Sequence, residues 1–220
     1  MNWIIEQRWN HVLFMHWRIN ARELQAHLPY DLDLFEGDAV ISIVPFRMNA
    51  IRFPFLPPVP FLSSLWELNL RTYVRVNKKP GVYFFTLDTD NRLGTLIANR
   101  FFNLPYRMAS FSGEITSEHY LFSSERGPYR FSVNAELSHQ PKKTSALDTW
   151  ATERYFVFTH DDQNDFEGQV LHEPWKLEAV SQFSFQDQFA AQVNLDLNHT
   201  PDEVSYCREL KVRFKPFLKI

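Results

Sequence analysis

Five polar side chains recur at every second position of one short segment: Glu67, Asn69, Arg71, Tyr73 and Arg75. The positions between them are almost all apolar. This alternation is the pattern of a β-strand, in which successive side chains point to opposite faces. The row therefore gathers a carboxylate, an amide, a phenol and two guanidinium groups on one face. If that face lines a closed cavity, it can bind a small polar or anionic molecule; if it faces solvent, it is an ordinary strand exterior.

Arg71 is the leading candidate for a ligand-binding residue in this row. A guanidinium group can hold a carboxylate through two parallel hydrogen bonds, and Asn69 and Tyr73 would support it. The alternative is an arginine in solvent, or one paired with Glu67. Glu67 itself is a candidate general base if burial raises the pKa of its carboxyl group, or a residue that neutralises a nearby arginine.

Three further candidates lie outside the row. Tyr106 and Arg107 follow a proline turn after a predicted helix. Tyr106 could donate a hydrogen bond to an oxyanion, and Arg107 could bind an anionic ligand or lie on the surface. His16 lies in an apolar stretch, so it is a candidate ligand contact or a hydrogen-bonded core histidine. A third interpretation of the function, beside small-molecule binding and a protein-interaction surface, is an enzyme with a bound metal ion that has His16 or His172 as a ligand.

Composition and charge exclude several classes of protein. A net charge of −3 without a basic stripe argues against a nucleic-acid partner. Cys207 is the only cysteine, which excludes an intrachain disulfide and a thiolate zinc site. The six glycines are too scattered for a phosphate-binding loop, and we predict no cofactor and no metal. No stretch approaches the ~20 apolar residues of a membrane span, so we expect a soluble, cytoplasmic protein with no membrane partner.

Aromatic residues make up 16% of the 220-residue chain, with 21 Phe, which favours a β-rich fold. Periodicity and turn residues predict strands over 13–18, 39–46, 67–76, 82–87, 109–116, 119–123, 129–137, 155–160, 167–172, 177–185 and 204–214. Helices are predicted over 21–26, 91–102 and 146–153. No linker or repeat interrupts this pattern. We therefore expect one domain over 1–220, of the α+β class with mainly antiparallel strands.

The segment 51–60 is both apolar and rich in proline. Its four prolines argue against a regular strand ladder, and its composition is too apolar for a disordered linker. It is therefore predicted to pack over something, as a lid, a cavity rim or a homo-oligomer contact, or else over its own core. If it forms an oligomer or partner surface, the protein is a non-catalytic interaction module, which is the alternative to small-molecule binding.

Several stretches, taken in order along the chain, resemble the YqjF-like family of uncharacterised bacterial proteins. They are Phe14–Arg18, Leu28–Pro29, Val44–Met48, Glu67–Val74, Gly81–Asp88, Leu104–Arg107, Thr152–Tyr155 and His172–Trp175. That family is grouped by fold with acetoacetate decarboxylase. The resemblance implies a curved antiparallel sheet that closes into a barrel or cone, with a few helices outside and a pocket inside.

The resemblance does not extend to the chemistry of the decarboxylase. Its Schiff-base lysine is matched here by Arg107, and a guanidinium group stays protonated and cannot form an imine. Its pocket arginine falls near Asn10, and one pocket glutamate falls near Ser42 or Ile43. We therefore predict a pocket that binds a small, anionic organic molecule without Schiff-base decarboxylation.

Overall fold

β-Strands dominate the computed structural model, which describes residues 3–59 and 64–220 apart from the side chains of residues 97, 98 and 101. The strands are β1 (Ile5–Ile19), β2 (Ala39–Arg52), β3 (Ser64–Val76), β4 (Lys79–Thr89), β5 (Tyr106–Met108), β6 (Ser110–Ile115), β7 (His119–Arg126), β8 (Tyr129–Pro141), β9 (Phe156–His160), β10 (Asp165–His172), β11 (Glu178–Asp187), β12 (Glu203–Phe214) and β13 (Leu218–Lys219). The helices are α1 (Ala21–Gln25), α2 (Arg92–Phe102), α3 (Ala146–Thr152) and the 3₁₀ helix η2 (Ala190–Val193). The mainly antiparallel α+β class predicted from the sequence is confirmed.

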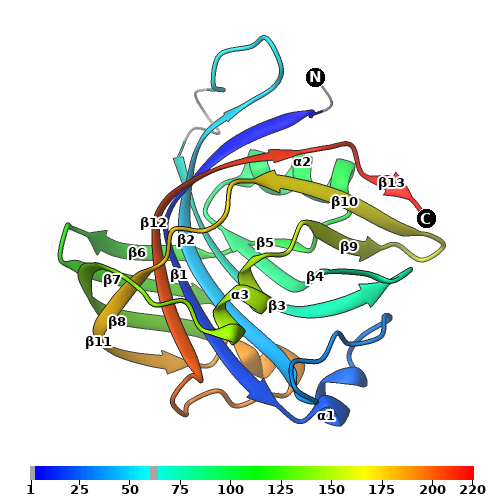
Figure 1. The fold of residues 1–220 in the computed structure, drawn as a ribbon. Coiled ribbons are helices and arrows are strands. Elements are labelled where there is room, and N and C mark those ends of the chain that lie inside the picture. The colour runs from blue at the N-terminus through cyan, green and yellow to red at the C-terminus, as the bar shows by residue number, and fades with distance from the viewer. Residues whose placement is uncertain (1–2, 60–63) are drawn as a thin grey trace.

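The strands join into one sheet whose hydrogen-bonded path returns to an earlier strand. The pairing runs β10–β9–β4–β3–β2–β1–β12, and β10 also pairs with β12 through Val170–His172 against Val212–Phe214. We call these seven strands the strand ring. Strands β11, β8, β7 and β6 continue from β12 to the opposite side of β1 and β2 (Figure 1), whereas β5 pairs with β4 and β13 pairs with β10.

Strands β1, β2 and β3 are buried on both faces. On one face, Leu13 of β1, Ile41 of β2 and Leu70 of β3 belong to the largest hydrophobic cluster, which includes residues of β7 and β8. On the other face, Phe14 and Val44 lie inside the strand ring. This double burial explains why 39–46 reads as a continuous apolar run in the sequence.

Two backbone irregularities change which side chains point into the ring. His11 in β1 and Ala50 in β2 have positive φ angles of 54° and 51°, and the pairing between β1 and β2 shifts register in the stretches that contain them. Such β-bulges add one residue to a strand and reverse its alternation. The inward residues of β1 are therefore odd-numbered before His11 and even-numbered after it. β1 begins at Ile5, well before the predicted start at residue 13.

Only the first two residues of the proline-rich segment 51–60 belong to a strand. Ile51 and Arg52 end β2, so the ladder extends further than its prolines suggested. Residues 53–59 form no strand, and Pro60 lies outside the described residues. Among the described residues, no helix has the length and apolar character needed to cross a membrane.

We expect Ala50→Gly to stabilise the protein by about 1 kcal/mol. A left-handed backbone costs a non-glycine residue about 1–2 kcal/mol, and glycine removes that strain. Ala179→Gly is the matched control, because Ala179 is a partly buried strand residue without a positive φ; it should lose about 0.5–1 kcal/mol. Urea unfolding measures both. Equal losses in the two variants would show that the bulge at Ala50 is not strained.

Candidate functional site

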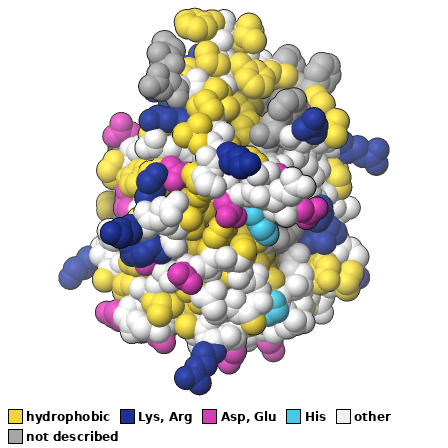
Figure 2. Space-filling model, turned by 90° about the vertical axis from the view of Figure 1, so that its right-hand side faces the viewer, with side chains coloured by type: hydrophobic (Ala, Val, Ile, Leu, Met, Phe, Trp, Pro, Cys, Tyr) yellow, Lys and Arg dark blue, Asp and Glu magenta, His cyan; other side chains and the backbone are white. Residues whose placement is uncertain are grey.

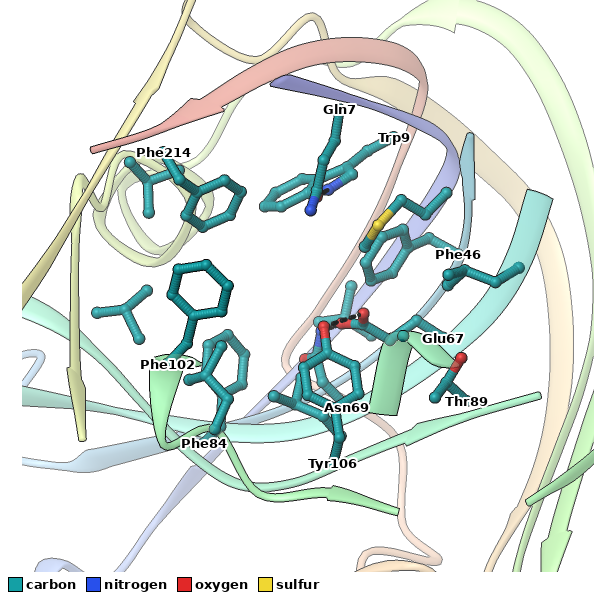
Figure 3. Close-up of a pocket in the computed structure, with 18 of the residues that line it drawn as sticks. Gln7, Trp9, Phe46, Glu67, Asn69, Phe84, Thr89, Phe102, Tyr106 and Phe214 are labelled. Atoms are coloured by element: carbon teal, nitrogen blue, oxygen red, sulfur yellow. Dashed lines mark hydrogen bonds between the residues drawn. The ribbon is translucent and has the colours of Figure 1, made fainter. Parts of the chain in front are cut away.

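The interior of the strand ring contains a cavity of about 130 Å³. Aromatic side chains form much of its wall, and Figure 3 shows several of them around an open centre. They include Trp9, Phe14, Phe46, Phe84, Phe102 and Phe214. Its polar side chains are few: Gln7, Glu67, Asn69, Arg71, Thr89 and Tyr106. An apolar cavity with a few polar groups is the usual form of a small-molecule site.

The polar row of β3 supplies three of these groups. Glu67, Asn69 and Arg71 alternate along the strand and all line the cavity. Tyr73 continues the row but lies beyond the cavity, where its ring centroid is 4.8 Å from that of Trp150. Arg75 ends the row outside the cavity, half exposed, with Nη2 2.6 Å from Oδ1 of Asp33.

Arg71 is a buried cation that forms no ion pair with a described residue, although its charge acts on Glu67. Its side chain is almost enclosed, with the whole residue 8% exposed, yet its guanidinium group makes no hydrogen bond or ion pair with any described residue. Its Cζ atom lies 5.3 Å from the ring centroid of Phe14 and 5.8 Å from that of Tyr73. Cation–π contacts of this kind contribute about 0.5–2 kcal/mol, whereas burying an unpaired charge costs several kcal/mol. The site can therefore accept one negative charge.

Glu67, which is buried, and Tyr106, which is partly buried, form a hydrogen-bonded pair that lines the same cavity as Arg71. The Tyr106 hydroxyl donates to Oε2 of Glu67 at 2.7 Å, as Figure 3 shows. Desolvation raises the pKa of Glu67 to about 7, although the Tyr106 and Asn69 hydrogen bonds and the charge of Arg71 act in the opposite direction. Burial and the nearby Glu67 raise the pKa of Tyr106 well above its usual range, so the phenol remains a donor. Asn99 fixes the Tyr106 backbone through hydrogen bonds of 2.9 and 3.1 Å.

A second hydrogen-bonded chain lies behind Arg71. Nδ1 of His16 is 2.7 Å from the Ser42 hydroxyl, which is 2.8 Å from the Tyr73 hydroxyl. Ser42 is the cross-strand neighbour of both His16 and Arg71. Burial, followed by the charge of Arg71, lowers the pKa of His16 well below its usual value, so the imidazole is neutral. The structure thus gathers Arg71, Tyr73 and His16, although only Arg71 lines the cavity.

The other candidates predicted from the sequence lie elsewhere. Arg107 is exposed on β5 and is not among the residues that line the cavity, whereas its neighbour Tyr106 points inward. His172 stacks on Tyr155, with ring centroids 4.7 Å apart. In the described part of the chain, no three His, Cys, Asp or Glu side chains are grouped as a metal ion would require.

Two polar cavity residues, Gln7 and Thr89, were missed by the reading of the sequence. Gln7 lies before the bulge in β1, in a segment that the sequence did not mark as a strand. Its alternation with Ile5 and Trp9 was the available signal. Thr89 faces the cavity because it pairs directly with Glu67 across β3 and β4.

Comparison with known proteins places this site in a family context. A family of uncharacterised conserved proteins, DUF2071, matches residues 6–211. The uncharacterised protein YqjF of Bacillus subtilis (strain 168) is 34% identical over 225 residues, covering 99% of this chain and 93% of YqjF. The resemblance to YqjF-like proteins seen in the sequence is confirmed.

Solved structures with a similar fold include acetoacetate decarboxylases and a biosynthetic enzyme. The acetoacetate decarboxylase of Legionella pneumophila superposes with a TM-score of 0.72 at 13% identity, over 97% of this chain and 86% of that chain. An acetoacetate decarboxylase-like enzyme from Sphingomonas wittichii RW1 gives a TM-score of 0.72 at 12% identity, over 100% and 94%. The enduracididine biosynthesis enzyme MppR, complexed with pyruvate, gives 0.65 at 9% identity, over 100% and 91%. At these identities the similarity shows the fold.

We expect Glu67→Gln to change how stability depends on pH. The folded-state pKa of about 7 lies above the ordinary value of 4.5, so the folded protein keeps a proton that the unfolded chain has lost. The Glu67 contribution is complete below pH 4.5 and is lost as the pH rises to 7, by about 3 kcal/mol.

Because glutamine does not titrate, Glu67→Gln should gain stability relative to the parent protein between pH 5 and pH 8. Denaturant unfolding at several pH values measures this difference. Glu114→Gln, at an exposed position of β6, is the control and should follow the parent protein. A constant difference between Glu67→Gln and the parent at all pH values would contradict the raised pKa.

Proposed function

Because the chain belongs to the DUF2071 family of uncharacterised conserved proteins, we propose that the cavity in its strand ring binds a small organic anion with an apolar body. The observation that carries this proposal is Arg71, a buried guanidinium group without a counter-ion among the described residues. A ligand carboxylate would supply the missing charge and accept two hydrogen bonds.

The size and lining of the cavity limit the ligand. A cavity of roughly 150 Å³ can hold benzene, so about 130 Å³ suits a body of similar or smaller size. The aromatic wall favours an aliphatic or aromatic body rather than a sugar or a polyanion, and a single unpaired arginine favours one negative charge. We therefore propose a short monocarboxylic acid.

We also propose that the strand ring serves as the barrel or cone implied by the family resemblance. Its pairing between β10 and β12 supports this, because a sheet joined in this way has no free edge beside the cavity. Walls held by backbone hydrogen bonds would keep the cavity open without a ligand, and binding would then require little ordering of the chain.

Binding by this route does not involve an imine. None of the described residues that line the cavity is a lysine, and Arg107, at the position matched to the Schiff-base lysine, is exposed. The decarboxylase-like neighbours therefore support a pocket in the same fold, and the residues of this chain support a different chemistry in it.

We expect Arg71→Met to weaken binding of pentanoate by about 10- to 100-fold, the loss of a charge-assisted hydrogen-bonded contact of about 1.5–3 kcal/mol. Pentanamide, which has the same body without the charge, should bind weakly to both proteins. Isothermal titration calorimetry measures the affinities. Arg107→Met removes an exposed guanidinium group outside the cavity and should bind pentanoate as the parent protein does.

Unfolding measurements show whether Arg71→Met remains folded. Because Arg71 has no ion-pair partner to strand, we expect its removal to leave stability unchanged or raised. Equal affinity of the parent protein and Arg71→Met for pentanoate, or a larger loss in Arg107→Met, would refute the assignment of Arg71 as the anion-binding residue.

One surface feature favours a second candidate function, an interaction module. The loop between β2 and β3 exposes 90% of Phe55 and 55% of Leu56. Figure 2 shows hydrophobic side chains gathered at the end of the molecule where this loop projects in Figure 1. Exposed apolar groups of this kind mark association surfaces in soluble proteins.

If this loop joins two copies of the chain, Phe55→Ser should lower the mass measured by sedimentation equilibrium at micromolar concentration. Phe53 is not changed in this test, because it lines the cavity and its loss would also alter the ligand site. An unchanged mass in Phe55→Ser would remove the interaction proposal and leave ligand binding unaffected.

A further inference from the structure

We propose that the cavity also catalyses proton transfer at a carbon atom, with Glu67 as the base and a short 2-oxo acid as the substrate. This inference rests on the proposed function, because the substrate carboxylate must first bind Arg71. It goes further in naming a reaction, the enolisation of a ketone, that needs no imine, metal or redox partner.

The geometry leaves one oxygen of Glu67 free for this task. Oε2 accepts the short hydrogen bond from Tyr106, whereas the only contact of Oε1 among the described residues is a long one of 3.5 Å, from Asn69 Nδ2. Glu67 lines the cavity and is buried. A carboxylate with one oxygen tethered and the other open to an apolar cavity is fixed in orientation and able to accept a proton from a ligand.

The strand aligns this base with the anion site. Arg71 and Glu67 lie on the same face of β3, with Asn69 between them, and all three line the cavity. A ligand whose carboxylate is held by Arg71 therefore extends along the strand past Asn69 toward Glu67. This order places a cation, an amide donor and a base along one wall of the cavity, so that their side chains can converge on one small molecule.

The burial of Glu67 supports the same assignment. Desolvation raises the pKa of its carboxyl group to about 7, which makes it a stronger base than an ordinary glutamate and leaves about half of it ionised at neutral pH. Such a carboxylate can remove a proton only from a carbon that a neighbouring carbonyl group makes acidic. A ligand with a carboxylate for Arg71 and a ketone in its body meets both requirements. In a cavity of about 130 Å³ the shortest such molecule, a 2-oxo acid, fits best.

The reaction balances without any further reagent. Oε1 of Glu67 takes a proton from C3, the electron pair of the C–H bond forms the C2=C3 double bond, and the carbonyl pair moves to the C2 oxygen. Arg71 and the Asn69 amide are the donors that stabilise this enolate. Return of the proton from Glu67 to C3 regenerates the ketone. If the proton on Glu67 exchanges with deuterated water first, the product carries deuterium at C3.

Tyr106 acts in this scheme as a positioning residue. Its hydroxyl holds Oε2 and stabilises the ionised carboxylate, and its own proton is not transferred because burial keeps its pKa high. Removing the hydroxyl with Tyr106→Phe should therefore raise the pKa of Glu67 and move the pH profile of the reaction to higher pH. A residue with only a packing role would change the rate without moving that profile.

The test follows deuterium incorporation into C3 of 2-oxopentanoate by proton NMR in deuterated buffer. We expect the parent protein to exchange these protons faster than buffer alone. Glu67→Gln should be at least about 100-fold slower, while calorimetry shows that it still binds 2-oxopentanoate. Glu114→Gln, exposed on β6, should exchange as the parent does.

Two kinds of failure can be told apart. If 2-oxopentanoate binds in an Arg71-dependent manner but its C3 protons do not exchange, the catalytic inference is wrong and the binding proposal stands. If neither 2-oxopentanoate nor pentanoate binds, both are wrong. Exchange that persists in Glu67→Gln, or a lysine adduct trapped by borohydride during exchange, overturns the role of Glu67.

Discussion

Burial of β1, β2 and β3 on both faces is the constraint on which the rest of the molecule depends. One face of these strands belongs to the hydrophobic cluster shared with β7 and β8, so the other must be covered by bending the sheet round until β10 pairs with β12. Large aromatic side chains fill most of the enclosed space, but they do not fill all of it. Polar groups that a strand exterior would present to water are thereby held in an apolar enclosure.

A second buried arginine of the same chain, Arg154, has an ion-pair partner within the protein. Arg154 is as buried as Arg71, but its Nη1 lies 2.6 Å from a carboxylate oxygen of Asp33, and its guanidinium Cζ lies 4.0 Å from the ring centroid of Trp150. Arg71 keeps the aromatic contacts and lacks the carboxylate. The difference between these two arginines is the basis on which we propose Arg71, and not Arg154, as the residue that binds an external anion.

Much of the site could be predicted from the sequence, because period two is a direct consequence of strand geometry. The alternation of the sequence placed Glu67, Asn69 and Arg71 on one face of a strand. Only the closed strand ring turns that face toward the interior of the protein. The predictions that missed or misplaced site residues failed for local structural reasons. A bulge such as the one at His11 reverses the alternation, so the pattern of Ile5, Gln7 and Trp9 does not continue in phase with the strand after it, and Gln7 was overlooked. β5 has only three residues, too few for periodicity to decide that Tyr106 points inward and Arg107 outward.

The bulges at His11 and Ala50 divide the parts of the cavity wall that β1 and β2 supply into two stretches of opposite alternation. Beyond them, toward the loop that carries Phe55, the inward set is fixed by one phase of the backbone; on the near side, where Arg71 lies, it is fixed by the other. A shift of one residue in the outer stretch would exchange a whole set of wall side chains and leave the inner polar groups untouched. Substitutions in this outer stretch would therefore alter the shape of the cavity without changing Glu67, Asn69 or Arg71.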